Sequence, residues 1–320
     1  MRAPYTITPG ILALVADISE KIGEVNANHL ARPPAEWRRS NRVRTIQSSL
    51  EMDGVLLSTD QIADMLEKKQ VFGPAGSIRA IKNAIEVYDK LHRFTPASLP
   101  SFQRAHKLLM TGLMESPGKI RTRLINYVRG DEIKYFPPDG KIVRQLLASL
   151  FEYLKNSRDI ALIKSCVFRY ELEFIHPFME GNGRLGRLWQ TVILMDQHPV
   201  FEFLPVDCII KKRQNFYYNS FGQAGGWGDS TAFIEFMLGV ILESLQELLS
   251  GPVPVLTALE RIERFGADIG TRSFSRKDYL KMYKAISTAT ASRDLREGVI
   301  KKILKKDGDK RAASYCFIAK

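Results

Sequence analysis

A long apolar segment near the middle of the chain is the feature that most constrains its fold. Residues 161–175, ALIKSCVFRYELEFI, are apolar on nearly every side, which is typical of a helix buried at the centre of a protein. After a short polar stretch, Leu185, Leu188 and Trp189 return at helical spacing. The polar stretch therefore joins a buried helix to the start of a second one.

Most of the remaining first 250 residues also carry helical patterns. The predicted helices cover residues 11–25, 37–52, 78–92 and 230–249. The second of them is basic and is expected to end at Asp53-Gly54. Residues 126–140 differ, because β-prone pieces flank a turn at Arg129-Gly130-Asp131 and Pro137-Pro138 follows. These patterns predict a helical body that carries a single β-hairpin.

The last fifty residues have a composition and pattern of their own. They contain 14 Lys and Arg against 5 Asp and Glu, which is +9 of the net charge of +12 of the whole chain. Ser275 and Ser287 are each placed to cap a helix, and Gly298 is expected to end the second helix. Two strand-like pieces joined by Asp307-Gly308 follow. Helix, turn, helix and basic hairpin predict a winged helix-turn-helix domain.

These patterns give the expected domain boundaries. Residues 1–100 form an N-terminal helical region, 101–250 a second helical region, 251–256 a linker and 257–320 the winged helix-turn-helix. A basic domain favours nucleic acid or another polyanion as its partner. If the partner is double-stranded DNA, the second helix would present Thr288, Ser292, Arg293 and Arg296 to a groove. Docking of a protein, or a basic surface that only aids solubility, is the alternative.

The composition excludes several classes of protein. The mean hydropathy of −0.15 is that of a soluble globular protein, and no run of 18 apolar residues could span a membrane. The first residues lack the apolar core and cleavage site of a signal peptide. Cys166, Cys208 and Cys316 are far apart and odd in number, which suits a reducing cytoplasm without structural disulfides. We therefore expect a soluble, cytoplasmic protein with no membrane partner.

The polar stretch IHPFMEGNGRLGR, residues 175–187, combines groups suited to a phosphate-rich ligand. Gly181, Asn182 and Gly183 lie at the predicted start of a helix, where free backbone N–H groups and the helix dipole favour an anion. Arg184 and Arg187 are three positions apart, so they share a helix face and can reach different phosphates. Taken singly, the glycines suit a turn and the arginines a solvated surface, so the prediction of an anion site depends on their combination.

Two further residues of the stretch supply the remaining chemistry. Glu180 is a hard carboxylate suited to Mg²⁺ that is shared with phosphates. His176 is the nearby group whose pKa suits it to accept a hydroxyl proton near neutral pH. A base, a metal carboxylate, an anion site and two arginines are the groups that attack by a hydroxyl on a nucleotide phosphate requires.

At every defining position the stretch resembles the signature of the Fic family, His-x-Phe-x-(Asp/Glu)-Gly-Asn-Gly-Arg-x-x-Arg. The resemblance extends over roughly residues 1–250 and includes PGKIR at 117–121, Tyr217-Tyr218 and SSLEMDGVLLS at 48–58. It implies an all-α Fic core with a small β-hairpin flap, in which residues 101–250 are the catalytic core. It also implies transfer of AMP from Mg-ATP to a Ser, Thr or Tyr hydroxyl of a target protein, with release of pyrophosphate.

The resemblance assigns a role to each polar residue of the stretch. Carried over by position, the roles are those of a general base (His176), an Mg²⁺ ligand (Glu180), an anion hole (Gly181, Asn182, Gly183) and β- and γ-phosphate ligands (Arg184, Arg187). Gly183 also distinguishes the chain from the related Doc kinases, which carry lysine there and transfer the terminal phosphate instead.

Two outlying segments complete the resemblance. The hairpin at 126–136 resembles the family's flap, which adds the target segment as a strand, so the expected target-binding residues are Ile133, Lys134, Tyr135 and Phe136. Tyr217 and Tyr218 are expected near the nucleotide base. The oligomeric state is left open, with a homodimer as one option.

One segment departs from the family pattern. Many Fic proteins carry Ser/Thr-x-x-x-Glu-Gly/Asn in an N-terminal helix, whose glutamate pairs with the second motif arginine and excludes the productive γ-phosphate. The matching register here runs from Ser49 to Gly54, so the acid is Asp53, shorter than glutamate by about one methylene, roughly 1.5 Å. We predict partial autoinhibition through a contact of Asp53 with Arg187. Alternatively, Asp53 only ends a helix; Glu51 faces another side and is a weaker candidate.

Two classes of function are compatible with these patterns. The first is an AMP transferase whose C-terminal domain positions it on DNA or on a protein partner. The second is a DNA-binding transcriptional regulator whose Fic site only senses nucleotide, although sensing would not require His176. The same loop also supports removal of AMP in some relatives. The intact loop favours the transferase, with ATP as substrate and Mg²⁺ as cofactor.

Overall fold

The chain folds into two compact units, residues 1–250 and 251–320. The computed structural model describes residues 4–28, 30–125, 127–129, 132–135, 137–221, 228–251, 256–284, 286–308 and 313–318. Each unit buries hydrophobic residues of its own.

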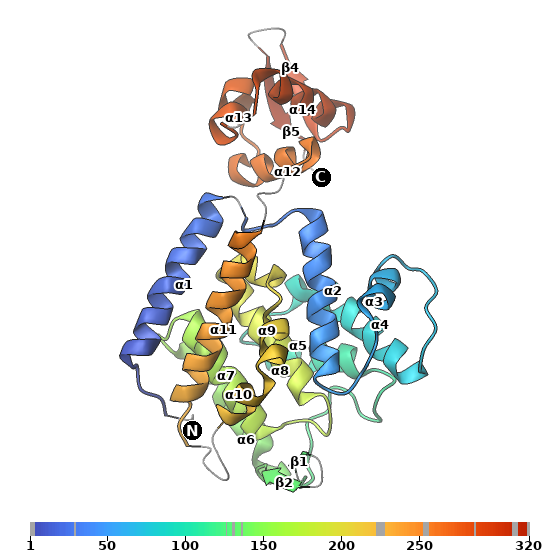
Figure 1. Ribbon diagram of the computed structural model, residues 1–320, viewed down its shortest axis with the longest axis vertical. Coiled ribbons are helices and arrows are strands. Elements are labelled where there is room, and N and C mark those ends of the chain that lie inside the picture. Colours follow the sequence, from blue (N-terminus) through green and yellow to red (C-terminus); the bar gives the residue numbers. More distant parts are fainter. Residues whose placement is uncertain are drawn as a thin grey trace. The chain divides into compact units, whose positions relative to one another are not determined.

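The first unit is almost entirely helical (Figure 1). Its α-helices are α1 (Pro9–Ala27), α2 (Ala35–Glu51), α3 (Thr59–Leu66), α4 (Ala75–Asp89), α5 (Leu99–Met110), α6 (Gly140–Asn156), α7 (Ala161–Ile175), α8 (Asn182–Met195), α9 (Val206–Lys212), α10 (Gln214–Asn219) and α11 (Thr231–Ser250). Two 3-10 helices, η1 (Leu91–Arg93) and η2 (Pro199–Phe203), and the antiparallel strands β1 (Tyr127–Arg129) and β2 (Glu132–Tyr135) complete it. The predicted helical body with one β-hairpin is confirmed.

The helices α1 and α11, from opposite ends of this unit's sequence, lie side by side (Figure 1). Thr8 caps α1 by accepting a hydrogen bond from the Ile11 N–H at 3.0 Å, and Pro9 fits the first turn because that turn needs no donor there. Ile11, Ile18 and Ile22 are buried on one face of α1. They belong to one hydrophobic cluster with residues of α7 and α11.

The helix α7 lies between two hydrophobic clusters, which explains why its sequence is apolar on nearly every side. Phe168, Leu172 and Ile175 join the cluster that contains α4, α5, α6 and α8. Val167 and Tyr170, on other faces of the helix, join the cluster that contains α1, α9 and α11. A helix in this position is held from both sides, so the loop that leaves its C-terminal end starts from a fixed point.

No break between compact units occurs near residue 100. The cluster around α4 extends from Val43 to Ile193 and includes residues on both sides of the expected boundary. The helix α2 packs against α4, α8 and α9, and so the N-terminal region is part of the same body as the loop at 176–187.

The second unit combines helices with a small antiparallel sheet. Its elements are α12 (Ala258–Ile269), β3 (Phe274–Ser275), α13 (Arg276–Met282), α14 (Thr288–Ile300), β4 (Leu304–Asp307) and β5 (Ser314–Phe317). The strand order is β3-β5-β4, and both pairings are antiparallel. Ser275 and Ser287 cap α13 and α14 as predicted, each accepting a backbone N–H three residues later. The turn expected between β4 and β5 lies largely outside the described residues.

Two features of the second unit differ from the expectation. Helix α12 was not predicted, although Thr257 and Glu260 form a capping box at its start and Ile262 and Phe265 are buried on one face. Gly298 does not end α14, which continues to Ile300. A Cβ at Gly298 would lie 2.8 Å from side-chain atoms of Ile262 and Leu304, so this glycine permits close packing of α14 on α12 and β4.

Candidate functional site

The polar loop runs from the C-terminal end of α7 to the N-terminal end of α8. His176 follows α7 in the left-handed conformation, with φ 48° and ψ 62°, and its N–H donates to the Leu172 carbonyl at 2.9 Å. Gly181, with φ +78°, immediately precedes α8. The two left-handed residues turn the chain so that the first backbone N–H groups of α8 face the loop, the arrangement that favours an anion.

Asn182 fixes the shape of the loop with its side chain. Its Oδ1 accepts a hydrogen bond from the Phe178 N–H at 2.9 Å, and its Nδ2 donates to the Phe178 carbonyl at 2.8 Å. The residue is 1% exposed. Both side-chain groups are therefore used within the loop, and Asn182 can serve an anion only through its backbone N–H.

His106 of α5 supports the loop through contacts with Phe178 and Glu180, and no sequence motif marks it. Its ring stacks on Phe178 with 3.7 Å between ring centroids. Its Nδ1 accepts the Gly118 N–H at 2.8 Å, so the proton is on Nε2, which donates to the Glu180 carbonyl at 2.9 Å. Burial lowers the pKa of His106 to about 4, with the Glu180 hydrogen bond opposing that shift. The ring is therefore neutral at physiological pH and can make both bonds.

Arg121 holds the other side of the loop. It is 3% exposed, and its guanidinium donates to the carbonyl groups of Ile175 (3.1 Å), His176 (2.7 Å) and Pro138 (2.7 Å). The Ile175 and His176 carbonyls lie at the C-terminal end of α7, where the last carbonyl groups of a helix have no partner within it. The Pro138 carbonyl lies just before α6. Arg121 lies within PGKIR, but its role as a brace could not be read from that segment.

His176, the first residue after α7, is half-buried. Burial lowers its pKa from the ordinary value of 6.5, Arg121 adds to that shift, and the charge and backbone of Glu173 oppose it. A lowered pKa keeps the imidazole neutral near pH 7, which is the form that can accept a proton.

Two arginines and one aspartate form the polar centre of the site. Arg187 is 4% exposed, and its Nη2 lies 3.2 Å from each carboxylate oxygen of Asp53. The Arg184 Nε donates to Asp53 Oδ2 at 2.5 Å. Ser49 accepts twice from Arg187, through its hydroxyl at 2.8 Å and its carbonyl at 2.7 Å. The structure thus brings together the predicted pair of Ser49 and Asp53 with both motif arginines.

Asp53 reaches the arginines from a turn and not from a helix. The helix α2 ends at Glu51, and Gly54 with φ +79° reverses the chain after Asp53. The short carboxylate therefore approaches closely enough to contact both arginines. Glu51 faces Lys211 and forms an ion pair with it, as expected of a residue on another side of α2. A Cβ at Gly183 would lie 3.2 Å from the Arg187 guanidinium, so glycine leaves room for this contact.

A second buried carboxylate near Arg187 was also missed. Asp207 of α9 is 5% exposed, and its Oδ2 lies 3.8 Å from the Arg187 Nε. Burial opposes the charge on Arg187, but Asp53 and Asp207 favour it enough to raise the pKa of the guanidinium. No motif marks Asp207, because it lies in a helix whose other features are those of an ordinary amphipathic segment.

Tyr217, expected near the nucleotide base, is buried beside Arg169. Its side chain is 4% exposed in the cluster around α11, and its hydroxyl accepts a hydrogen bond from Arg169 at 3.2 Å. Arg169 also lies over its ring, 5.0 Å from the centroid. The ring and the hydroxyl of Tyr217 thus both contact Arg169. The Tyr218 ring packs beside it, 5.2 Å between centroids.

Glu180 and the hairpin complete the predicted set. Glu180 is exposed and lies two positions before the start of α8. The strands β1 and β2 place Ile133 opposite Val128 and Tyr135 opposite Tyr127, with a register irregularity between the latter pair and the rest. Phe136 and the side chains of Ile133, Lys134 and Tyr135 lie outside the described residues.

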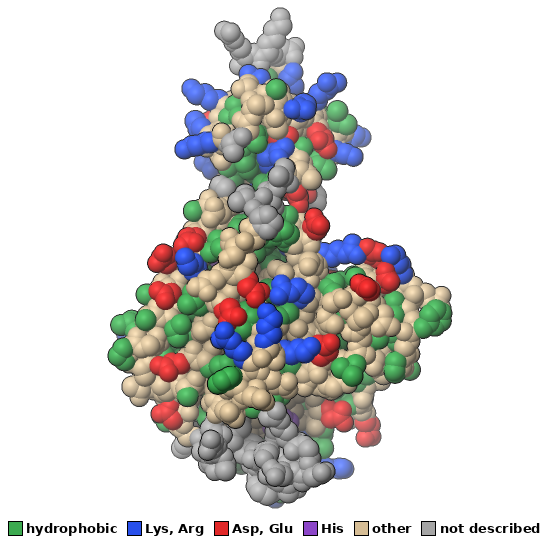
Figure 2. Space-filling view, viewed as in Figure 1, with side chains coloured by type: hydrophobic (Ala, Val, Ile, Leu, Met, Phe, Trp, Pro, Cys, Tyr) green, Lys and Arg blue, Asp and Glu red, His purple; other side chains and the backbone are tan. Residues whose placement is uncertain are grey.

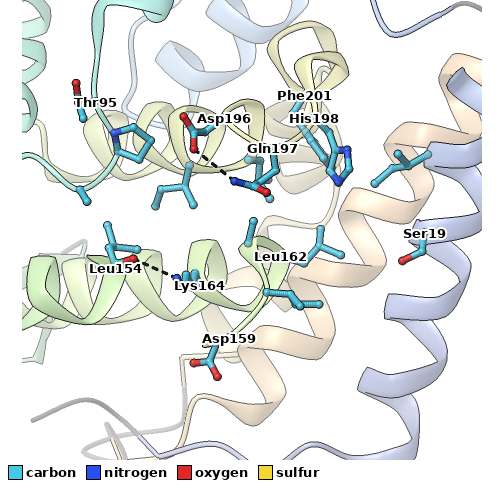
Figure 3. Close-up of a pocket in the computed structure, with 17 residues that line it drawn as sticks. Ser19, Thr95, Leu154, Asp159, Leu162, Lys164, Asp196, Gln197, His198 and Phe201 are labelled. Carbon is cyan, nitrogen blue, oxygen red and sulfur yellow. Dashed lines mark hydrogen bonds between the residues drawn. The ribbon is translucent and has the colours of Figure 1, made fainter. Parts of the chain in front are cut away.

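A cavity of about 690 Å³ lies away from this loop (Figure 3). Lys164 near the start of α7 and Asp196 just after α8 lie on facing walls, and Ser19 of α1 contributes a third wall. The loop joins the opposite ends of α7 and α8, about one helix length away, or roughly 20 Å. None of the loop residues lines the cavity, so it is separate from the candidate site.

Comparison with known proteins identifies the family. A model of the Fic/DOC family matches residues 96–194. The crystal structure of a Fic family protein from Desulfovibrio desulfuricans G20 superposes with a TM-score of 0.76 and 32% identity, covering 100% of this chain and 99% of that one. The chain belongs to the Fic family.

Two curated Fic relatives are longer than this chain. Protein adenylyltransferase fic-1 of Caenorhabditis briggsae is 26% identical over 67% of this chain and 45% of its own length. Protein adenylyltransferase Fic of Culex quinquefasciatus is 27% identical over 72% of this chain and 46% of its own. The chain thus spans less than half the length of these Fic proteins.

Proposed function

We propose that this Fic protein transfers AMP from Mg-ATP to a Ser, Thr or Tyr hydroxyl of a target protein. The observation that carries the proposal is the loop in which His176, Arg184 and Arg187 surround the N-terminal end of α8. Curated relatives that share part of this chain carry the name protein adenylyltransferase, which supports the same activity.

In the proposed reaction the target hydroxyl loses its proton to His176 and its oxygen forms a bond to the α-phosphorus. The bond between the α-phosphorus and the bridging oxygen breaks, and pyrophosphate leaves. The backbone N–H groups of Gly181, Asn182 and Gly183 would bind phosphate oxygens. Arg184 and Arg187 would pair with the β- and γ-phosphates.

Glu180 is the proposed Mg²⁺ ligand. It is an exposed carboxylate beside the anion site, and its position is fixed because His106 holds its carbonyl. The described residues contain no group of three or more His, Cys, Asp or Glu that could hold a metal. A single carboxylate fits Mg²⁺, because this ion commonly keeps several waters and takes its other ligands from phosphates, whose charge it neutralises.

The hairpin of β1 and β2 is the proposed flap for the target. It is a two-stranded antiparallel sheet, and an added peptide strand would extend it through main-chain hydrogen bonds. Ile133, Lys134, Tyr135 and Phe136 would then contact the target. We further propose a cytoplasmic location. Among the described helices, none is both long and apolar enough to cross a lipid bilayer.

Asp53 is the proposed inhibitor of the transferase. It is bound to the two arginines that the β- and γ-phosphates of ATP would need, so nucleotide can bind productively only after Asp53 withdraws. The contact is exposed on one side, with 26% of the Asp53 side chain accessible, and partial inhibition is expected.

The deciding experiment supplies purified protein, Mg²⁺ and host lysate with ATP labelled at the α- or the γ-phosphate. We expect protein labelled from the α-phosphate alone. The His176→Ala variant should lose roughly 10²–10⁴-fold in labelling while ATP binding persists. Label from the γ-phosphate would instead indicate kinase chemistry. Release of AMP from pre-labelled protein would indicate removal of AMP as the main activity.

We propose, as a second function, that the second unit is a winged helix-turn-helix that binds double-stranded DNA. On α14, Thr288, Arg293 and Arg296 are exposed and Ser292 is half-buried, so the four predicted residues lie on the outer side of the helix. Asp294 on the opposite side is buried against Arg261, at 2.6 and 2.8 Å. Figure 2 shows Lys and Arg side chains over much of the visible surface of this unit.

A salt titration tests the DNA proposal. Retention of the full chain on duplex DNA should weaken steeply between about 50 and 200 mM salt. Arg293→Ala and Arg296→Ala should lower the affinity, whereas Lys82→Ala, at an exposed site of the first unit, should not. An affinity for DNA that is unchanged in all three variants would speak against DNA recognition by α14. Such a result would also remove the alternative of a DNA-binding regulator that senses nucleotide.

A further inference from the structure

Arg187 lies close to a second carboxylate, that of Asp207, besides its contact with Asp53. Arg187 is 4% exposed, its guanidinium lies 3.2 Å from Asp53, and it donates two hydrogen bonds to Ser49. Asp207, from a different helix, lies on the Nε side at 3.8 Å. This distance is too long for a hydrogen bond, and Asp207 Oδ2 accepts none from the described residues.

Two carboxylates therefore face one buried cation, but they differ in how freely they can leave. Asp53 lies in a turn with 26% of its side chain exposed, so it can move into solvent. Asp207 has 6% of its side chain exposed and is part of α9. The helix α9 is tied to α2 by the Ser48 hydroxyl on the Cys208 sulfur, at 3.2 Å, and by the ion pair of Lys211 with Glu51. Asp207 must therefore remain near Arg187.

Withdrawal of Asp53 would otherwise leave an unfavourable state. A buried arginine without a counter-ion loses its hydration without compensation, and breaking a buried pair is among the most destabilising changes in proteins. Arg169 does not relieve this, because it is a second cation nearby and its own donors are used by Gln190 (2.6 Å) and Tyr217 (3.2 Å). Only an anion that stays can balance Arg187 until a phosphate arrives.

We propose that Asp207 is a reserve counter-ion for Arg187, which holds the guanidinium when Asp53 withdraws and so makes the inhibitory contact releasable. While Asp53 is bound, Asp207 is the less favoured anion. Burial raises the pKa of Asp207, the charges of Arg187 and Arg169 and a hydrogen bond with the Ser49 side chain oppose that shift, and the nearby charge of Asp53 adds to it. When Asp53 leaves, its repulsion ends and the Arg187 charge is free to pair with Asp207.

Asp207 is thus a positioning residue and does not touch the reacting atoms. It keeps Arg187 in place for the γ-phosphate during the interval between release of the inhibitor and binding of ATP. This consequence for regulation rests on the proposed AMP transfer. The counter-ion role itself can be measured without turnover, so an inactive protein would not decide against it.

Thermal unfolding of the full chain tests the proposal with the variants Asp53→Asn, Asp207→Asn and the double variant. All three tryptophans lie within residues 1–250, so their fluorescence reports the unfolding of the first unit. Each single change should lower the midpoint of thermal unfolding only slightly, because the other carboxylate still balances the charge of Arg187. The double change should lower it by roughly 5 °C more than the sum of the single shifts. Additive shifts would overturn the proposal.

A suppressor variant separates a counter-ion from a packing residue. Adding Arg187→Met to the double variant removes the cation that needs an anion, so most of the lost stability should return. Arg169→Met in the same background is the matched control and should restore nothing. If the double variant fails to fold, a folded triple variant with Arg187→Met supports the proposal. A triple variant that gains nothing from Arg187→Met shows that Asp207 does not serve Arg187.

Discussion

Arg187 donates from one nitrogen, Nη2, to both carboxylate oxygens of Asp53, at 3.2 Å each. The same carboxylate also accepts from Arg184. One aspartate in a turn thus contacts both arginines of the loop motif at once. The contact depends on the chain reversal at Gly54, where φ is +79°.

Removal of the charge on Asp53 should raise the rate of AMP transfer or self-modification. In Asp53→Asn the side chain that contacts both arginines loses its charge, so it no longer competes with the phosphates of ATP for them. We expect an increase on the order of tenfold, which corresponds to about 1.4 kcal/mol. Glu51→Gln is the matched control, because Glu51 pairs with Lys211 and not with the motif arginines. Equal transfer rates for Asp53→Asn and the wild type would remove the inhibitory role.

The contact of Asp53 with Arg187 shows how far sequence reasoning reaches. The register of Ser49 and Asp53 could be aligned with a known pattern, and the structure places both on Arg187. That Asp53 would also contact Arg184 could not be predicted, because it depends on where α2 ends relative to α8. A difference of one helical residue would have directed the carboxylate elsewhere.

The supporting residues of the loop lay beyond sequence reasoning for a different reason. His106, Arg121 and Asp207 come from three separate elements, and none lies in a local pattern that specifies a ligand. Their roles arise only when α5, α9 and the segment after α5 pack around the loop. The helix α7 was predicted correctly because burial on both sides leaves a mark on every position of its own sequence.

The rate of transfer should depend on the protonation of His176. Only the neutral imidazole can accept the hydroxyl proton, and burial lowers the pKa of His176 from 6.5. The value of kcat/KM should therefore be flat above pH 6.5 and fall as the pH drops through a midpoint below 6.5. ATP affinity, measured over the same range, is the control for loss of binding. A midpoint above 6.5 would show that a different group is the base.

Acid should destabilise the first unit through His106. Its pKa is about 4 in the folded chain against an ordinary 6.5, so the unfolded chain binds the proton first. The contribution of the neutral ring is complete above pH 6.5 and is lost as pH falls from 6.5 toward 4. By pH 4.5 the loss is on the order of 2 kcal/mol. The free energy of unfolding can be measured with urea, in the presence of EDTA, at pH 7 and at pH 4.5. It should differ less between the two pH values for His106→Gln than for the wild type; equal differences would contradict this assignment.

Gly181 should not tolerate a side chain. Its φ of +78° is strained for any other residue, and a Cβ would lie 2.6 Å from the sulfur of Met110, which is buried. Gly181→Ala should lower the free energy of unfolding by about 1–3 kcal/mol and tilt the start of α8, which weakens ATP binding as well. Gly239→Ala in α11 meets no atom within 4 Å and should be neutral or slightly stabilising. Unchanged stability and ATP affinity in Gly181→Ala would show that the left-handed turn is not required.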